Sequence, residues 1–404
     1  MNSKWIKPSD PVFDYTGRID FDNTDAPVLV YACSSIGFRT NTQSAYVMFD
    51  NKHSYYENSI GVAVNGEYRG KIVLHDGERT QGETIEEYLL SLSENGENTG
   101  NDFLKNLEYQ LKTIADKQKM ANVKQPTSDL RVYDLTPYLD GKENEILLFK
   151  RMDACHYVTF LGLIADEGTV HKSKFPKPAR RIEVYGDSVS CGEVSEAVDR
   201  CGMDDPEGHN GIYSNSYYSY SWILARKMGA SIHDISQGGI SLFDGDGYFD
   251  MPNTKGMLSC YDKITYNPSL GEVKPWDFSK YIPHVVIVAI GQNDAHPVNY
   301  MAEDFTGESA LHWRKEYRHF IEKLRSLYPK ALIVLSTTIL GHDKAWDEAI
   351  ELVAQEMEDP KVVHFLYSNN GCGTSGHIRI PEAEKMANEL QAFLETQGDS
   401  IWEG

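Results

Sequence analysis

From residue 182 onward, the chain alternates short runs of strand-forming residues with longer amphipathic stretches. The strand-like runs occur five times, at residues 182–185, 231–235, 284–290, 331–335 and 362–366. Stretches with a helical repeat lie between and after these runs, near residues 214–229, 308–328, 344–357 and 381–396. Strands that alternate with helices predict a parallel sheet covered by helices on both faces. We therefore expect a three-layer α/β domain over residues 180–404.

Residues 1–175 carry a different pattern. Short β-rich runs separated by Asn, Gly and Asp occur at residues 27–31, 45–49, 59–64, 70–74, 145–149 and 157–161. This spacing predicts an all-β sandwich or jelly roll. Leu104, Leu107, Leu111 and Ile114 instead repeat at helical spacing, which predicts an amphipathic helix over about 101–120, in an insertion near residues 82–122. The apolar stripe of that helix either packs on the sandwich, contacts another subunit or borders an active site.

The charge balance excludes several classes of partner. The 404 residues include 39 Lys and Arg against 60 Asp and Glu, so the formal net charge is −21. Phosphate binding needs a basic surface, so we expect no nucleic-acid or anionic-membrane partner, and a neutral substrate such as a carbohydrate fits better. No apolar run approaches the roughly 18 residues of a membrane helix, and the first ten residues lack the apolar segment of a secretory signal. We therefore expect a cytoplasmic protein, and a homo-oligomer is compatible with these features.

Four residues with complementary chemistry follow four of the five predicted strands. Ser188 lies in a Gly-Asp-Ser turn after the first strand, Gly239 in a glycine turn after the second, Asn293 after the third and His377 after the fifth. The carboxyl ends of parallel strands meet at one edge of a sheet, so these residues are expected to lie together. Acyl transfer needs a nucleophile, a base and donors for the developing oxyanion. The sequence therefore predicts an ester-cleaving site at this edge.

The same order of residues resembles the SGNH (GDSL-type) hydrolase superfamily, which is named for its Ser, Gly, Asn and His. The resemblance covers about residues 180–396. It implies that Ser188 is the nucleophile and that His377 is the general base and then the acid to the leaving alcohol. It also implies an oxyanion hole made by the backbone N–H groups of Ser188 and Gly239 and by the side-chain amide of Asn293. No cofactor and no metal are implied.

One position departs from the superfamily pattern. Thr374 stands three residues before His377, where members of the superfamily normally carry Asp. A hydroxyl cannot supply the negative charge that stabilises an imidazolium. Three alternatives follow: a backbone carbonyl orients His377, a distant carboxylate does so, or the activity is lowered.

A β-sandwich followed by an SGNH domain is similar to carbohydrate esterase family 2, whose members remove O-acetyl groups from xylan and related hemicelluloses. The resemblance implies an acetylesterase that acts on acetylated oligosaccharides of the xylan or mannan type, through a Ser–His dyad and an acetyl-enzyme. Two alternatives stay open. One is an esterase or thioesterase for other acyl chains, and the other is a degenerate glycan-binding protein, which Thr374 leaves open.

Three further residues are candidates for substrate contact. Trp346 follows the fourth strand and could stack on a sugar ring, with packing in the core as the alternative. His296 follows the Asn293 motif, with an ordinary surface position as the alternative, and Asp187 directly precedes the nucleophile. No histidine pair has the spacing of a metal site such as HExxH, and the six cysteines form no CxxC pair, so we expect no metal and free thiols.

Overall fold

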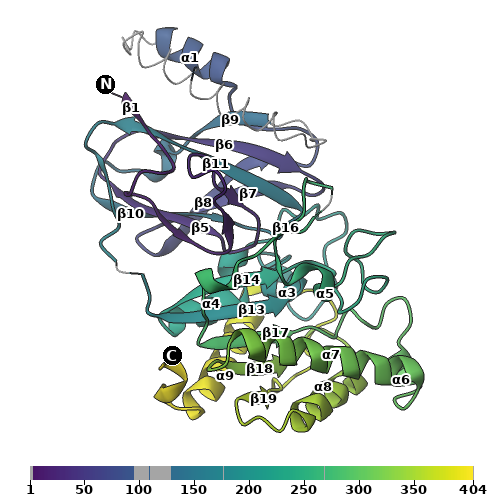
Figure 1. Cartoon of the computed structure of the whole chain (residues 1–404). Helices are drawn as coiled ribbons and strands as arrows, with labels where there is room; N and C mark the ends of the chain where they lie inside the picture. The colour runs from purple at the N-terminus through teal and green to yellow at the C-terminus, as the bar shows by residue number, and fades with distance from the viewer. Residues whose placement is uncertain (1–2, 95–108, 110–128, 176, 268, 404) are drawn as a thin grey trace.

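The computed structural model describes residues 3–94, 109, 129–175, 177–267 and 269–403 (Figure 1). The amphipathic helix predicted over 101–120 lies outside the described residues, apart from residue 109. Within the described ranges, no helix is both long and apolar enough to cross a membrane.

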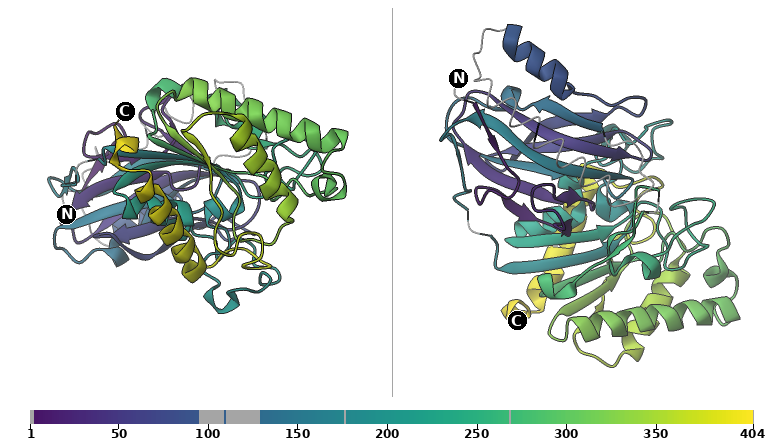
Figure 2. Two further views of the ribbon diagram at one scale, coloured as in Figure 1. Left: turned by 90° about the horizontal axis from the view of Figure 1, so that it is seen from below. Right: turned by 45° about the horizontal axis from the view of Figure 1, so that its top comes forward.

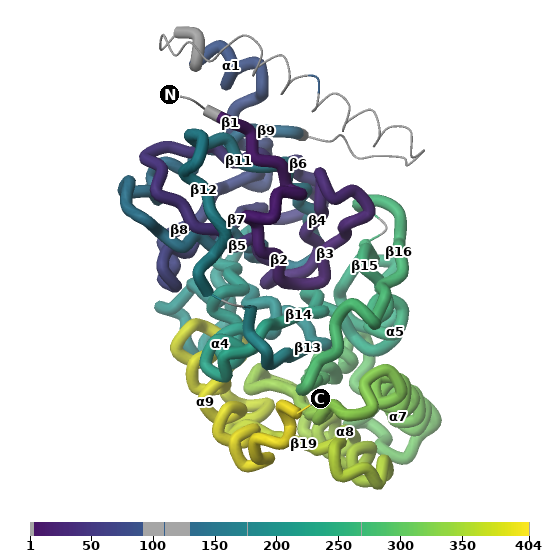
Figure 3. The backbone as a smooth tube through the Cα atoms, turned by 60° about the vertical axis from the view of Figure 1, so that its left-hand side comes forward, coloured from purple at the N-terminus to yellow at the C-terminus, as the bar shows by residue number. Residues whose placement is uncertain are grey.

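The N-terminal part is a sandwich of two antiparallel sheets, as predicted (Figures 1 and 3). The first sheet has the order β3-β4-β11-β6-β9, with β1 also paired to β11. It consists of β1 (Ser3–Ile6), β3 (Ile19–Asp20), β4 (Val28–Leu29), β6 (Ala45–His53), β9 (Asp129–Asp134) and β11 (His156–Asp166). The second sheet has the order β12-β5-β10-β7-β8, with β2 also paired to β5. It consists of β2 (Asp14–Thr16), β5 (Ser35–Thr40), β7 (Asn58–Val64), β8 (Glu67–His75), β10 (Asn144–Lys150) and β12 (Val170–His171).

All six strand runs predicted in this half coincide with strands of the sandwich. The strands that the sequence did not reveal are either two to four residues long or, like β5 and β9, interrupted by Gly, Arg or Asp. Helix α1 (Ile85–Glu94) lies on the outer face of the first sheet (Figure 1). Its Tyr88 belongs to one buried apolar cluster with Met48, Val132 and Ile164 of that sheet.

The C-terminal part contains five parallel strands in the order β14-β13-β17-β18-β19. These strands are β13 (Arg180–Gly186), β14 (Ala230–Ser236), β17 (Val285–Ala289), β18 (Leu332–Ser336) and β19 (Val362–His364). Their main helices are α4 (Tyr220–Lys227), α7 (Glu308–Leu327), α8 (Lys344–Glu356) and α9 (Ile380–Thr396). Shorter elements are α3 (Ser188–Cys191), α5 (Met257–Cys260), α6 (Tyr300–Glu303), β15 (Lys263–Thr265) and β16 (Lys274–Pro275). The predicted helix over 214–229 is shorter than expected, because a 3-10 turn at Ser216–Tyr218 precedes α4.

Successive residues of the central strands face opposite sides of this sheet. Val286 and Val288 of β17 pack in one apolar cluster with side chains of α7 and α8. Val285 and Ile287 pack in a second cluster with side chains of α4 and α9. Alternate side chains of a strand point to opposite faces, so both faces are buried and the strands read as continuous apolar runs. The three-layer α/β prediction is confirmed, with α9 on the opposite side of the sheet from α7 and α8 (Figure 2).

The two parts are joined by buried polar contacts. Arg18, from the segment between β2 and β3, donates hydrogen bonds to the carbonyl oxygens of Tyr261 (2.6 Å) and Lys263 (3.0 Å). Its guanidinium also lies 3.6 Å from Oε2 of Glu183 on β13, and both side chains are fully buried. The boundary between the domains, placed at residues 175–180, stays a prediction.

Replacing Arg18 by methionine is expected to lower the free energy of unfolding by about 3–5 kcal/mol, because it leaves the Glu183 carboxylate buried without its cation. Urea titration followed by tryptophan fluorescence measures the change. The control is Lys4→Met, which removes an exposed ion pair with Glu167 and should cost under about 1 kcal/mol. Equal unfolding midpoints for the two variants would contradict the expected role of Arg18.

Candidate active site

A cavity of about 660 Å³ opens at the carboxyl edge of the parallel sheet. Ser188, Gly239, Asn293 and His377 all line it. The structure therefore brings together four residues that the sequence places at the ends of four different strands. The sandwich supplies another part of the wall, through Ser54, Tyr55, Tyr56, Met152 and Asp153.

Ser188 is the first residue of the one-turn helix α3, directly after β13. Asp187 caps this turn, because its carboxylate accepts a hydrogen bond from the backbone N–H of Val189 at 3.0 Å. The cap holds the strand-to-helix turn in place and keeps Ser188 at the cavity wall with only 4% of its surface exposed.

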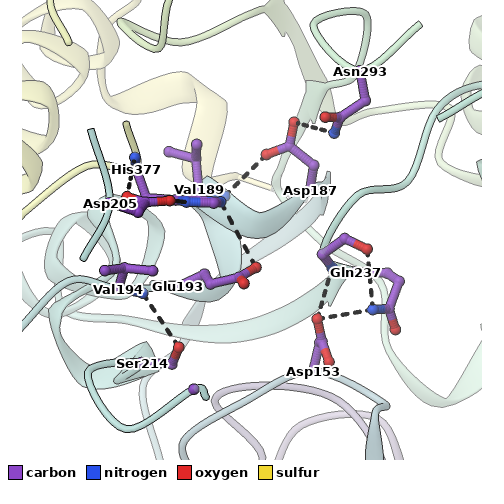
Figure 4. Close-up of polar contacts among 12 residues, drawn as sticks. Asp153, Asp187, Val189, Glu193, Val194, Asp205, Ser214, Gln237, Asn293 and His377 are labelled. Carbon is purple, nitrogen blue, oxygen red and sulfur yellow. Dashed lines mark hydrogen bonds and ion pairs between the residues drawn. The ribbon is translucent and has the colours of Figure 1, made fainter. Parts of the chain in front are cut away.

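His377 is held by Asp205, a carboxylate that the sequence analysis did not identify. Nδ1 of His377 lies 2.6 Å from Oδ2 of Asp205, and the two side chains face each other (Figure 4). The backbone N–H of His377 and the guanidinium of Arg379 both donate to Oδ1 of Asp205, each at 2.9 Å. Thr374 does not take this place, because its hydroxyl donates to the carbonyl of Gly376. Of the three alternatives that followed from Thr374, the geometry matches the second, in which a distant carboxylate orients His377.

Gly376 allows the Asp205 loop to approach His377. A Cβ atom at position 376 would lie 2.5 Å from the carbonyl oxygen of Met203 and 2.8 Å from both the backbone nitrogen and Oδ1 of Asp205. These distances are shorter than real Cβ contacts, so a larger residue would displace the loop. Asp205 lies 172 residues before His377 in a stretch without strand or helix periodicity, and no local spacing links the two residues in the sequence.

The contacts of Asp205 and His377 shift both of their pKa values. Burial by itself would raise the pKa of Asp205, but hydrogen bonds from His377 and Arg379 and the charge of His377 hold it well below its usual range. Burial by itself would lower the pKa of His377, but the carboxylates of Glu193 and Asp205 outweigh it, and the net shift is upward. The pair therefore stabilises an imidazolium, which is the form that a general base reaches after it accepts a proton.

The candidate oxyanion donors differ in how they are engaged. The backbone N–H of Gly238 donates to Oδ2 of Asp153 at 2.7 Å, so within this turn Gly239 is the better candidate donor. The side-chain amide of Asn293 donates to Oδ2 of Asp187 at 3.2 Å and to the carbonyl of Ile240 at 3.0 Å. Donation from Asn293 to an oxyanion therefore requires that the longer contact, with Asp187, gives way.

Asp187 does not contact the cavity, and the expectation that it touches substrate is corrected. Its side chain is fully buried below the nucleophile turn, where Asn293 donates to its Oδ2 (Figure 4). Gln292 donates to the same oxygen. Burial raises the pKa of Asp187 to about 6, against the opposing effect of the hydrogen bonds from Val189 and Gln292. Asp187 thus links the nucleophile turn to the Asn293 loop.

Trp346 does not contact the cavity either, and its predicted substrate contact is wrong. Its side chain is 0% exposed, and its indole N–H donates to Oδ1 of Asn299 at 3.0 Å. The ring packs edge-on against Trp313 and Tyr300. The physical reason is that α8 begins at Lys344, which turns Trp346 onto the helix face that packs on the sheet.

His296 supports the cavity from outside it. Its Nδ1 lies 3.0 Å from the carbonyl oxygen of Gly247, and its ring lies 4.1 Å from the ring of Tyr248. Tyr248 itself lines the cavity, and so does Tyr55; their exposed fractions are 52% and 38%. The aromatic side chains at the opening therefore come from loops that the sequence analysis did not single out. In the described part of the chain, no group of three metal-ligating side chains occurs.

The chain is similar to known proteins over both of its parts. Residues 15–90 match the family described as "Carbohydrate esterase 2 N-terminal". The chain is 32% identical over 266 residues to "Cellulase/esterase CelE" of Acetivibrio thermocellus, a match that covers 63% of this chain but only 30% of CelE. It is 27% identical over 266 residues to "Acetylxylan esterase / glucomannan deacetylase" of Cellvibrio japonicus, covering 65% of this chain and 69% of that protein.

A solved structure shares the whole fold. The structure of a family two carbohydrate esterase from Clostridium thermocellum in complex with cellohexaose superposes with a TM-score of 0.66 at 22% identity. The match covers 95% of this chain and 98% of the other. The match over the sandwich and the two relatives show that this chain is related to proteins of carbohydrate esterase family 2, and the solved structure shows that it shares the arrangement of both domains.

Proposed function

We propose that the protein is a serine acetylesterase that removes O-acetyl groups from acetylated hemicellulose oligosaccharides of the xylan or mannan type. The observation that carries this proposal is that Ser188, Gly239, Asn293 and His377 all line one cavity, and that Asp205 is bound to Nδ1 of His377. These groups supply a nucleophile, a base, oxyanion donors and a carboxylate that orients the base.

The reaction proceeds in two halves. His377 accepts the hydroxyl proton of Ser188 at Nε2 while the Ser188 oxygen attacks the acetyl carbonyl, and Asp205 holds the proton on Nδ1. The N–H groups of Ser188 and Gly239 and the amide of Asn293 stabilise the oxyanion. His377 then protonates the departing sugar oxygen, which leaves an acetyl group on Ser188. Water attacks this ester with His377 again acting as base, and acetate is released.

The opening of the cavity suits a sugar chain. Tyr55 from the sandwich and Tyr248 from the α/β domain stand at the cavity with exposed rings, and aromatic faces stack on the apolar faces of sugars. The relative from Cellvibrio japonicus is described as an acetylxylan esterase and glucomannan deacetylase, and the Clostridium thermocellum structure holds cellohexaose. Both descriptions support an oligosaccharide as the partner of this cavity.

The test is acetate release from acetylated xylan and glucomannan oligosaccharides, with NMR to identify the hydroxyl that loses its acetyl group. We expect acetate from at least one of these substrates, and hydrolysis of 4-nitrophenyl esters that falls steeply from acetate to octanoate. Rates that rise with acyl length would favour an esterase or thioesterase for other chains. Oligosaccharide binding without any turnover would contradict the esterase and favour a glycan-binding protein.

A further inference from the structure

A second carboxylate faces the catalytic histidine. Glu193 lines the same cavity, five residues after the nucleophile. It reaches this place because α3 ends after one turn at Gly192, whose φ of +75° is in the left-handed region. A Cβ atom at Gly192 would lie 2.6 Å from the carbonyl oxygen of Asn215, so this tight turn requires glycine. The turn directs Glu193 back toward the nucleophile and His377.

Glu193 lies at the nitrogen of His377 that must accept the serine proton. Its Oε2 is 3.8 Å from Nε2 of His377, whereas Nδ1 is bonded to Asp205 (Figure 4). Both side chains of this second pair are largely buried, with 13% of Glu193 and 22% of His377 exposed. The imidazole therefore stands between two carboxylates, one at each nitrogen. The proposed reaction uses only the first of them, Asp205.

We propose that Glu193 is a positioning residue that holds a proton on Nε2 of His377 and thereby sets the pH at which the esterase becomes active. The inference rests on the proposed esterase reaction. When Nε2 carries this proton, the charge of Glu193, 3.8 Å away, stabilises the imidazolium, and Nε2 cannot accept the proton of Ser188. When the proton leaves to water, the Nε2 lone pair is free, and the hydroxyl proton of Ser188 can move to it as the Ser188 oxygen attacks.

The charges around Glu193 favour a shared proton. Within the described part of the chain, Glu193 forms an ion pair with His377 alone, whereas Asp205 forms ion pairs with both His377 and Arg379. The carboxylate of Asp153 lies close to that of Glu193 and adds a further negative group. A Cβ atom placed on Gly238 would lie between them, 2.9 Å from Oδ2 of Asp153 and 2.9 Å from Oε2 of Glu193. Other titratable groups also act on this centre. They are Asp187 below the nucleophile, His209, Tyr55 and Tyr56 on the loops around it, and the buried thiols of Cys155 and Cys191.

The directions of the pKa shifts agree with this arrangement. Burial raises the pKa of Glu193 to about 7, and Asp153, Asp205 and Asp187 act in the same direction, whereas His377 opposes them. The pKa of His377 is itself raised, because Glu193 and Asp205 outweigh burial. A base with a raised pKa is neutral only at higher pH, so activity rises with pH through the loss of this proton. Removing the charge of Glu193 lowers the pKa of His377 and extends activity to lower pH.

The test is the pH dependence of kcat/KM for 4-nitrophenyl acetate in Glu193→Gln, which keeps the shape of the side chain and removes its charge. We expect the acidic limb of the kcat/KM profile to shift to lower pH by about one unit. At a given pH on this limb, the variant then shows about tenfold more of its full activity than the wild type does. The control is Glu207→Gln, which removes the charge of an exposed residue of the Asp205 loop and should leave the limb in place. An acidic limb at the wild-type pH in Glu193→Gln would overturn the inference.

A direct titration separates this inference from the proposed function. The pKa of His377 is measured by NMR of the imidazole carbons, with His377→Gln used to assign its signal. A lower His377 pKa in Glu193→Gln supports the inference even if no ester is hydrolysed, in which case only the proposed function fails. Ester hydrolysis by the wild type together with an unchanged His377 pKa overturns the inference alone. If Glu193→Gln does not fold, Glu193→Asp withdraws the carboxylate from Nε2 and is expected to shift the titration in the same direction.

Discussion

Alanine in place of Ser188 is expected to lower the rate of acetate release by about 10⁶-fold, the size of loss that removal of a nucleophilic serine causes in related mechanisms. Without the hydroxyl, no acetyl-enzyme forms, and only direct attack by water beside the oxyanion donors remains. Acetate release from acetylated xylo-oligosaccharides gives the rate. Mass spectrometry of the quenched protein shows whether an acetyl group accumulates on the wild type and is absent from the variant.

Ser190 provides the matched control, because it lies in the same turn and its hydroxyl contacts Tyr220 inside the protein. Ser190→Ala is expected to keep its rate within a few-fold of wild type per folded molecule. Thermal unfolding of both variants checks that each is folded. A Ser188→Ala protein that retains a tenth of the wild-type rate would show that the ester is cleaved by another group.

Asparagine in place of Asp205 is expected to lower kcat by about 10⁴-fold, with little change in KM. The amide keeps the shape of the carboxylate but can donate a hydrogen bond to Nδ1, which leaves the proton of the neutral imidazole on Nε2. In that tautomer Nε2 cannot accept the proton of Ser188. The lost negative charge also lowers the pKa of His377, because Asp205 is one of the carboxylates that raise it. Steady-state kinetics across a pH series measures both effects.

Asp204→Asn is the control for this substitution, since Asp204 is the exposed neighbour of Asp205 on the same loop. It should leave kcat near the wild-type value. Asp205→Asn also takes a charged partner from the fully buried Arg379, so its melting temperature is recorded together with its activity. A folded Asp205→Asn protein with wild-type kcat would mean that His377 acts without this carboxylate, as a Ser–His dyad.

Local sequence patterns predicted most of the C-terminal half of the fold. Strand and helix periodicity gave the five strands, and the alternation of the two elements implied the parallel sheet that the structure contains. In the sandwich, the strands with clear β-rich runs were predictable, whereas short ones such as β2 carry too few residues to show a period. The positions of Ser188, Gly239, Asn293 and His377 followed from one rule, because parallel strands end at a common edge.

Burial could not be read from the same patterns. Trp346 was expected at the cavity because it follows a strand, but the first turn of α8 rotates its side chain into the core. Tyr55 and Tyr248 stand at the cavity although neither belongs to a motif. The direction of a single side chain depends on where a helix or turn begins, and a shift of one residue changes the face that it occupies.

Local patterns in the chain were enough to establish the two architectures, the order of the strand ends around the candidate site and the chemistry of the residues that follow them. Each of these depends on neighbours within a few residues, and such short-range patterns leave a visible period or motif. Three features became visible only in the folded chain: Asp205 is the carboxylate that binds His377, Glu193 faces the other nitrogen of that ring, and the sandwich closes one side of the cavity. These contacts join irregular loops and different domains, and their geometry comes from the packing of the whole chain, as the space left open at Gly376 for the Asp205 loop illustrates.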